Sequence, residues 1–175
     1  VWDMKEKMDK SVYHNIILNE DVEKLLALND DEKEEFLLVL IYKYLAWKSL
    51  AEMNEVQKTL YLASKLEDIC QVDALPSLSE EKIFLVLPDI KIAYENLGAF
   101  KSAALLDEFI TLIPVGIVPE WGCFFEEERV NIIDRIDGEL CDYPDGPMYK
   151  IYIAYISTLQ NAKQLLMGLG NLQRN

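Results

Sequence analysis

Residues 124–146 read FFEEERVNIIDRIDGELCDYPDG and contain eight carboxylates and two arginines. Four kinds of structure use such a concentration: a cage for a metal ion, an active site built on a carboxylate pair, a surface that meets a basic partner, and an ordinary solvated helix face. Each makes its own demand on residue type and spacing, so the four can be compared on the sequence.

The acidic segment lacks the spacing of a metal site. An EF-hand loop needs oxygen ligands at alternate positions, a central glycine and a glutamate at the twelfth position, and Asp134, Asp137 and Gly138 do not follow that order. Zinc would find only His14 and three scattered cysteines, Cys70, Cys123 and Cys141. We therefore expect no metal and no other cofactor.

Catalytic side chains other than carboxylates are scarce. A hydrolytic nucleophile usually needs a histidine as its base, and His14, the only one, is interpreted as structural. Carboxylate pairs act through raised pKa values in a dry cleft, whereas these acids lie on a polar helix face. Gly168-x-Gly170 has neither the third glycine nor the preceding strand of a dinucleotide loop. We predict no enzymatic activity; the less favoured alternative is a carboxylate-dependent hydrolase at residues 114–122, which a deep pocket beside Trp121 would support.

The acidic segment divides into two sides when it is read as a helix. The apolar side comprises Val130, Ile133, Ile136 and Leu140. The opposite side comprises Glu127, Asn131, Asp134 and Gly138, flanked by Glu128 and Asp137. The carboxylates are therefore predicted to point into solvent. An acidic solvated face is common in itself, so this pattern alone does not distinguish a binding surface from an ordinary one.

Such a face can imitate DNA phosphates only with help from other elements. Duplex DNA carries about one charge per 1.7 Å of its axis. A helix with an acid at every third or fourth residue offers about one charge per 5 Å, which is too sparse. Further acidic stretches lie at 20–23 and 30–35, and in the turn that holds Asp142 and Asp145.

Helical periodicity extends over nearly the whole chain, and no stretch alternates as a strand would. Asn29 and Asp30 are predicted to open one helix, Pro88 to lie in the first turn of another, and Gly98 to end it in a left-handed conformation. Residues 36–47 are apolar on nearly every side, as in a helix at the centre of a bundle. The last helix is predicted over about 148–167.

These elements predict an all-α fold, a compact single-domain bundle of about seven to eight helices. Residues 31–167 are expected to form its core, with 1–30 as an N-terminal appendage. The hydrophobic content of 51% in 175 residues is that of a globular protein.

The overall charge excludes several classes of partner. Seventeen basic residues against 31 acidic ones give a net charge of −14, which repels nucleic acid and anionic lipid and attracts basic proteins. The longest nearly uncharged run, 36–47, is about 12 residues, whereas a bilayer requires about 20. An odd number of cysteines fits a reducing compartment. We expect a cytoplasmic protein that binds neither nucleic acid directly nor a membrane.

The stretch LPDIKIAYENLGAFKSAALLDEFITLIP, followed by EEERVNIIDRIDGELCDYPDG and YKIYIAYI, resembles the C-terminal two-thirds of the DNA mimic protein 19-like family, a bacterial domain of unknown function. The matching features are a helix that ends in LGAFKSAALL, a following Phe-x-x-x-Ile-Pro, and an acid-rich helix before a final helix that ends in AYI. They cover residues 87–156. Where family members have Asn-Gly-Gly-Phe, this chain reads EMNEVQKTLYLAS and keeps at most Asn54 and Tyr61.

The resemblance implies an all-helical cytoplasmic protein, in some cases dimeric, that presents carboxylates as a decoy for DNA phosphates and occupies a DNA-binding transcription factor. The predicted function is therefore non-enzymatic binding of a basic protein; an immunity-type inhibitor of a basic toxin is the alternative. A homodimer could form through the acid-free last helix, or that helix could be buried in one copy. The predicted binding residues are Glu127, Glu128, Asp134, Asp137, Glu139, Asp142 and Asp145, with Asp30, Asp31, Glu34 and Glu35 as a second patch.

Overall fold

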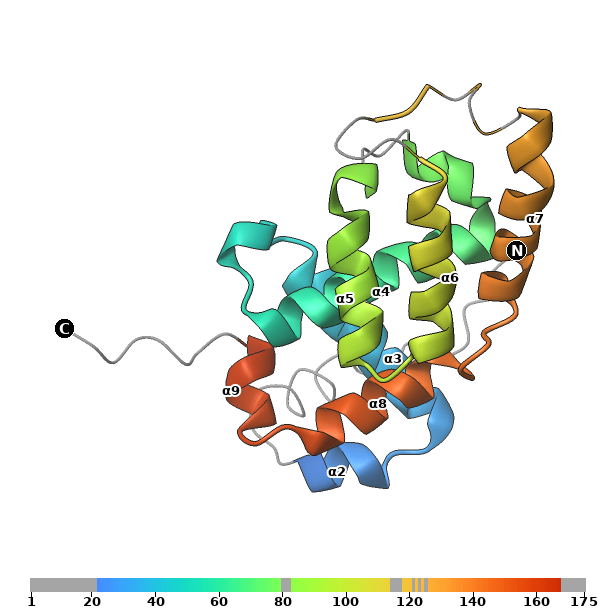
Figure 1. The fold of residues 1–175 in the computed structure, drawn as a ribbon. Coiled ribbons are helices and arrows are strands. Elements are labelled where there is room, and N and C mark those ends of the chain that lie inside the picture. Colours follow the sequence, from blue (N-terminus) through green and yellow to red (C-terminus); the bar gives the residue numbers. More distant parts are fainter. Residues whose placement is uncertain are drawn as a thin grey trace, which may run out of the picture. The chain divides into compact units, whose positions relative to one another are not determined.

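The computed structural model describes residues 22–79, 83–113, 118–120, 122, 124 and 126–167. Every regular element in these ranges is a helix, so the predicted all-α class is confirmed (Figure 1). The chain separates into two compact units, Val1–Gln57 with Tyr152–Asn175, and Lys58–Ile151. The single domain, with its appendage at 1–30, stays a prediction. Predictions outside the described residues are those on His14, on Trp121 with most of the 114–122 loop, on Cys123, and on Gly168 and Gly170.

The first unit opens with α2 (Val22–Ala27) and α3 (Asp30–Val39). Asn29 lies at the start of α3 as predicted and caps it, because its side-chain oxygen accepts a hydrogen bond from the backbone N–H of Glu32 at 2.9 Å. The Glu32 carboxylate accepts in return from the Asn29 N–H at 3.0 Å, which completes a capping box. Two donors that the helix start leaves unpaired are thereby satisfied.

The apolar stretch after α3 is not buried on every side, so that prediction is wrong. The helix continues from Leu40 to Leu45 as the π-helix η1, whose wider turn is closed by a bond from Ala46 N–H to the Ile41 carbonyl at 2.9 Å. One side of this stretch packs in the core, including Leu40 and Leu45 at 0% exposure. The other side faces solvent: Leu38 is 50% exposed and Trp47 is 85% exposed.

Asn54 joins the start of α4 to α9. After the short 3₁₀ helix η2 (Leu50–Glu52), its side-chain oxygen accepts from the Gln57 N–H at 2.9 Å and so caps α4 (Glu55–Val72). The Asn54 amide also donates to the Leu165 carbonyl at 2.7 Å, and the Gln57 amide donates to the Leu166 carbonyl at 2.8 Å. These carbonyls belong to α9 (Ala162–Met167). Asn54 is therefore a structural cap at the start of α4.

The predicted last helix is interrupted, which corrects its boundaries. It consists of α8 (Met148–Thr158) and α9, separated at residues 159–161. Asn161 has a φ of 58°, a left-handed conformation that asparagine tolerates better than most residues and that an α-helix cannot contain. On the apolar side of α8, Tyr152 and Ile156 are buried within the chain, at 2% and 0% exposure.

The second unit contains most of α4, the short 3₁₀ helices η3 (Leu75–Ser79) and η4 (Ile83–Val86), and the helices α5 (Leu87–Asn96), α6 (Phe100–Thr111) and α7 (Glu127–Cys141). Helices α5 and α6 lie side by side, joined by the turn at Gly98 (Figure 1). Gly98 has a φ of 78°, so the predicted left-handed end of α5 is confirmed.

The core of the second unit forms where α4, α5, α6 and α7 present their apolar sides. Leu60, Ile90, Leu106 and Ile136 have no exposed surface. Three phenylalanine rings, Phe84, Phe109 and Phe124, pack together with centroid separations of 5.4–6.4 Å. This interior leaves the polar sides of α6 and α7 to form the surface described next.

Candidate acidic interaction surface

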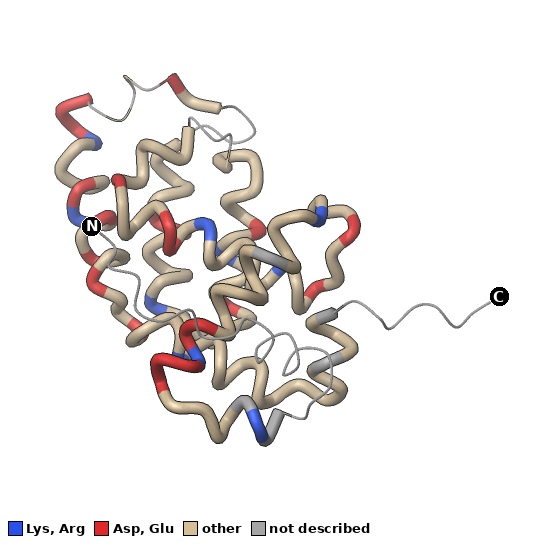
Figure 2. Tube along the Cα trace, turned by 180° about the vertical axis from the view of Figure 1, so that it is seen from behind, with Lys and Arg blue, Asp and Glu red and all other residues tan. Residues whose placement is uncertain are grey.

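Helix α7 buries one side and exposes the other, as its periodicity predicts. Ile133, Ile136 and Leu140 are 3%, 0% and 5% exposed, whereas Glu127 and Asp134 on the opposite side are exposed. Figure 2 shows acidic positions recurring along the α7 trace, with basic positions among them. The carboxylates of this helix therefore lie toward solvent. Their availability to a partner depends on which of them already pair with groups of this chain.

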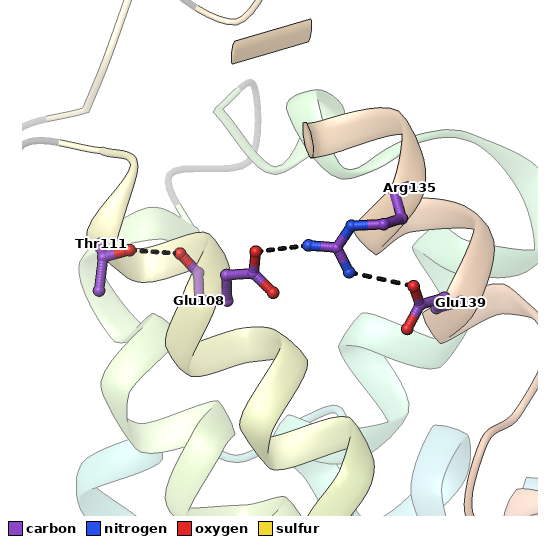
Figure 3. A network of polar contacts seen from close by, with 4 residues as sticks. All are labelled: Glu108, Thr111, Arg135 and Glu139. Atoms are coloured by element: carbon purple, nitrogen blue, oxygen red, sulfur yellow. Dashed lines mark hydrogen bonds and ion pairs between the residues drawn. The ribbon is translucent and has the colours of Figure 1, made fainter. Parts of the chain in front are cut away.

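The two arginines of α7 each pair with glutamates. Arg129 lies 3.3 Å from the Glu126 carboxylate at the helix start. Arg135 reaches Glu139 one turn later at 3.0 Å and also pairs with Glu108 of α6 (Figure 3). Hydrogen bonds, first to Glu108 and then to Glu139, raise the pKa of Arg135. The predicted binding residue Glu139 is thus partly neutralised within the chain.

Glu108 is part of this surface, although the sequence prediction omitted it. Its carboxylate accepts from Arg135, and its backbone carbonyl accepts from the Thr111 hydroxyl at 2.6 Å (Figure 3). Helical periodicity places Glu108 opposite the buried Leu106, so its exposure could have been predicted. Its contact with α7 depends on the packing of α6 against α7, which no local pattern reveals.

Asp145 holds the N-terminal end of α6. Its Oδ1 accepts from the Lys101 N–H at 3.1 Å, and its Oδ2 accepts from both the N–H and the hydroxyl of Ser102 at 2.8 Å. A carboxylate at this end of a helix satisfies unpaired N–H groups and interacts favourably with the helix dipole. Asp145, predicted to bind a partner, therefore caps a helix.

Asp137 is also engaged inside the unit. Its Oδ1 accepts from the backbone N–H of Leu75, at the start of η3, at 2.8 Å. Burial raises the pKa of this half-buried carboxyl, the Leu75 hydrogen bond opposes that shift, and the nearby charges of Asp134 and Asp73 add to it. Like Asp145, this side chain joins two elements instead of pointing freely into solvent.

Four predicted carboxylates remain exposed and form no ion pair with the residues that the structure describes. They are Glu127, Glu128, Asp134 and Asp142. The name acidic face is used below for these four residues. Glu127 and Glu128 occupy the first turn of α7, where negative charge interacts favourably with the helix dipole.

The second predicted patch lies on α3, in the other unit. Asp31 and Glu34 are exposed and Glu35 is half-exposed. Asp30 lies 4.0 Å from Lys33, a contact of little energetic weight on an exposed helix. Because α3 and α7 belong to different units, each patch is treated by itself.

Other kinds of site find little support in the described part of the chain. It contains no group of three or more His, Cys, Asp or Glu side chains placed to hold a metal ion. A cavity of about 10 Å³, which admits about one water molecule, lies beside Cys70, Tyr94 and Tyr143. Among the described helices none combines the length and the apolar character that crossing a bilayer requires.

No protein-family model, curated protein or solved structure matches this chain.

Proposed function

We propose that this protein is a non-enzymatic binding protein whose acidic face on α7 takes the place of DNA phosphates on a basic, DNA-binding partner. The observation that carries the proposal is that some carboxylates of α7 and of the turn after it bind groups in the part of this chain that the structure describes, whereas others do not. Asp137 and Asp145 accept hydrogen bonds from the fold, and Glu139 pairs with Arg135. Glu127, Glu128 and Asp134 have no such role and stay exposed.

The spacing along α7 suits selected phosphates instead of a continuous strand. Residues 127 and 134 are seven positions apart, about 10 Å along a helix that rises about 1.5 Å per residue. Phosphates of one DNA strand advance about 3.4 Å per nucleotide along the axis, so the two carboxylates are more widely spaced than neighbouring phosphates. A partner whose lysines or arginines contact phosphates at such intervals could bind them in the same places.

The charge of the whole chain supports encounter with such a partner. A net charge of −14 raises the association rate with basic proteins, most strongly at low ionic strength where the field extends furthest. The acidic face then sets the orientation. Because the charges that would meet the partner are exposed and salt screens them, binding should weaken steeply as salt is added.

The proposal is tested by affinity capture with three forms of the protein, at low and at high salt. They are the wild type, the variant Glu127→Gln/Glu128→Gln/Asp134→Asn, and a matched control, Glu55→Gln/Asp89→Asn/Glu120→Gln, which removes three exposed charges that belong to neither predicted patch. Both variants have the same net charge. We expect the wild type and the control to retain basic proteins at low salt, and the α7 variant to lose them.

The captured proteins are then purified and challenged with duplex DNA. We expect DNA to displace this protein from its partner, because both occupy the same lysines and arginines. Capture that is unchanged in the α7 variant, or a complex that DNA does not disturb, would contradict the proposal. A complex with one basic enzyme that also survives high salt would favour the immunity-type alternative.

A further inference from the structure

Two of the three cysteines, Cys70 and Cys141, are 71 residues apart in sequence and lie in the second unit. Cys70 is in the last turn of α4 and Cys141 is the last residue of α7. Both are half-buried and both are free thiols in this structure. The two thiols lie near enough to each other that each affects the pKa of the other.

Neighbouring hydrogen bonds fix this arrangement independently of the thiols. The Gln71 amide donates to the Tyr143 hydroxyl at 2.6 Å, one and two residues beyond the two cysteines. On the other side, the Leu75 N–H donates to Asp137, which is one helical turn before Cys141. The ends of α4 and α7 are thus tied together on both sides of the cysteine pair.

From this juxtaposition we propose that Cys70 and Cys141 form a redox modification site, which a small uncharged peroxide converts into a reversible disulfide between the ends of α4 and α7. The pair has both groups that the reaction needs, a first thiol to be oxidised and a second to resolve it. Half-burial admits a small molecule while it keeps a second protein chain from reaching both sulfurs.

The reaction proceeds in two steps, formation of a sulfenic acid and then of the disulfide. The Cys141 thiolate attacks one oxygen of hydrogen peroxide, the O–O bond breaks, and a sulfenic acid forms as hydroxide leaves and is protonated to water. The Cys70 sulfur then attacks the Cys141 sulfur, the S–O bond breaks, and a second water leaves as the disulfide forms. Two electrons pass from the two sulfurs to the peroxide, and an external thiol reverses the change.

The surroundings assign the first step to Cys141. Burial and then the neighbouring Cys141 thiol raise the pKa of Cys70. At Cys141 burial is again the largest effect and raises the pKa, but there the contact with Cys70 lowers it, so Cys141 is the thiol that its neighbour helps to ionise. Both pKa values stay above the ordinary one, so the reaction should be slow at neutral pH and quicken about tenfold per pH unit while the thiolate is scarce. The ionisable groups that face the pair are Glu67, Tyr94, Asp137, Asp142 and Tyr143.

These negative charges also select the oxidant. Asp137 and Asp142 disfavour a thiolate at Cys141, and they repel an oxidant that is itself an anion. Glutathione disulfide carries net negative charge at neutral pH, whereas hydrogen peroxide is neutral. We therefore expect peroxide to oxidise the pair and glutathione disulfide to react more slowly than it does with the same chain unfolded in urea.

The test uses the full chain with Cys123→Ser, so that only the pair remains. The reduced protein is treated with hydrogen peroxide at low protein concentration and then alkylated, and its intact mass and proteolytic peptides are measured. We expect the loss of two hydrogens in the monomer, a cross-linked peptide that joins Cys70 to Cys141, and full recovery of both thiols with dithiothreitol. Sulfinic acid at either cysteine, or dimers in place of an internal link, would overturn the proposal.

Single-thiol variants check the order of the steps. With Cys70→Ser added, Cys141 should accumulate a sulfenic acid that dimedone traps; with Cys141→Ser added, Cys70 should be labelled several-fold less. Equal labelling, or stronger labelling of Cys70, would refute the assignment of the first step. Circular dichroism shows whether each variant is folded, and a cross-link that appears only in urea would refute the site in the folded protein.

Discussion

Asp145 shows how one carboxylate in an acidic segment can be structural while its neighbour is not. It accepts three hydrogen bonds at the start of α6, whereas Asp142 is exposed and forms no ion pair with the described residues. Asp145→Asn removes the charge and one acceptor oxygen, so we expect it to lower the free energy of unfolding by about 1–2 kcal/mol. Urea unfolding measures this, with Asp142→Asn as the matched control, expected within about 0.5 kcal/mol of wild type. Equal effects of the two substitutions would contradict the cap.

Substitution of Asp137 by asparagine should change the free energy of unfolding in the opposite direction and stabilise the protein. Burial raises the folded pKa of Asp137, so its ionised form opposes folding; the stability it contributes is present below its unfolded pKa and is lost as the pH rises through the folded pKa. Asp137→Asn keeps the acceptor for the Leu75 N–H. We expect Asp137→Asn to raise the free energy of unfolding by no more than about 0.5 kcal/mol near neutral pH, because the Asp137 carboxyl is partly solvated. The gain should vanish at pH values where the wild-type carboxyl is protonated; urea unfolding at both pH values measures it, and a loss near neutral pH would be the contrary result.

The sequence predicts which carboxylates of α7 point outward, but not which of them are engaged. Outward direction follows from local periodicity, so Glu127 and Asp134 are where the pattern places them. The partners of Asp137 and Asp145 lie 62 and 43 residues away in sequence. Such contacts depend on how helices pack, which periodicity does not encode. For the same reason the approach of Cys70 to Cys141 could not be foreseen, since in the sequence the cysteines are only scattered residues.

At the scale of elements, the sequence predicts helix boundaries best where a residue's own backbone preference sets them. Asn29 and Gly98 have the predicted roles at the ends of α3 and α5, because capping oxygens and left-handed glycines act locally. The break at 159–161 was missed, since Asn161 in a left-handed conformation follows from the chain turning from α8 to α9. The π-helix at Leu40–Leu45 was missed as well, because an apolar run looks the same in either helix.

Replacing either of two glycines in the second unit by alanine should change the free energy of unfolding, but in opposite directions. Gly98 has a φ of 78°, so Gly98→Ala should cost about 1–2 kcal/mol in backbone strain. Gly138 lies inside α7, and a Cβ there meets no atom within 4 Å, so Gly138→Ala should stabilise by about 0.5–1 kcal/mol. A Cβ at Gly98 also meets no atom within 4 Å, so the expected difference between the two variants comes from the backbone conformation and not from steric contact. Urea unfolding of both variants measures the difference; a stable Gly98→Ala protein would mean that α5 can end without a left-handed residue.

At the scale of the whole molecule, the acidic charge should make stability depend on salt. A net charge of −14 means that repulsion among carboxylates exceeds the attraction of the ion pairs, such as Arg135 with Glu139, and salt screens both. We expect the melting temperature to rise by a few degrees between low and physiological ionic strength, because about 1 kcal/mol shifts it by about 2–4 °C in a chain of this size. Thermal unfolding followed by circular dichroism measures the rise. The variant Glu127→Gln/Glu128→Gln/Asp134→Asn should show a smaller rise, since it lacks three of the four carboxylates of the acidic face. A melting temperature that falls with salt would show that the ion pairs outweigh the repulsion, and the surface would then hold less uncompensated charge than a basic partner requires.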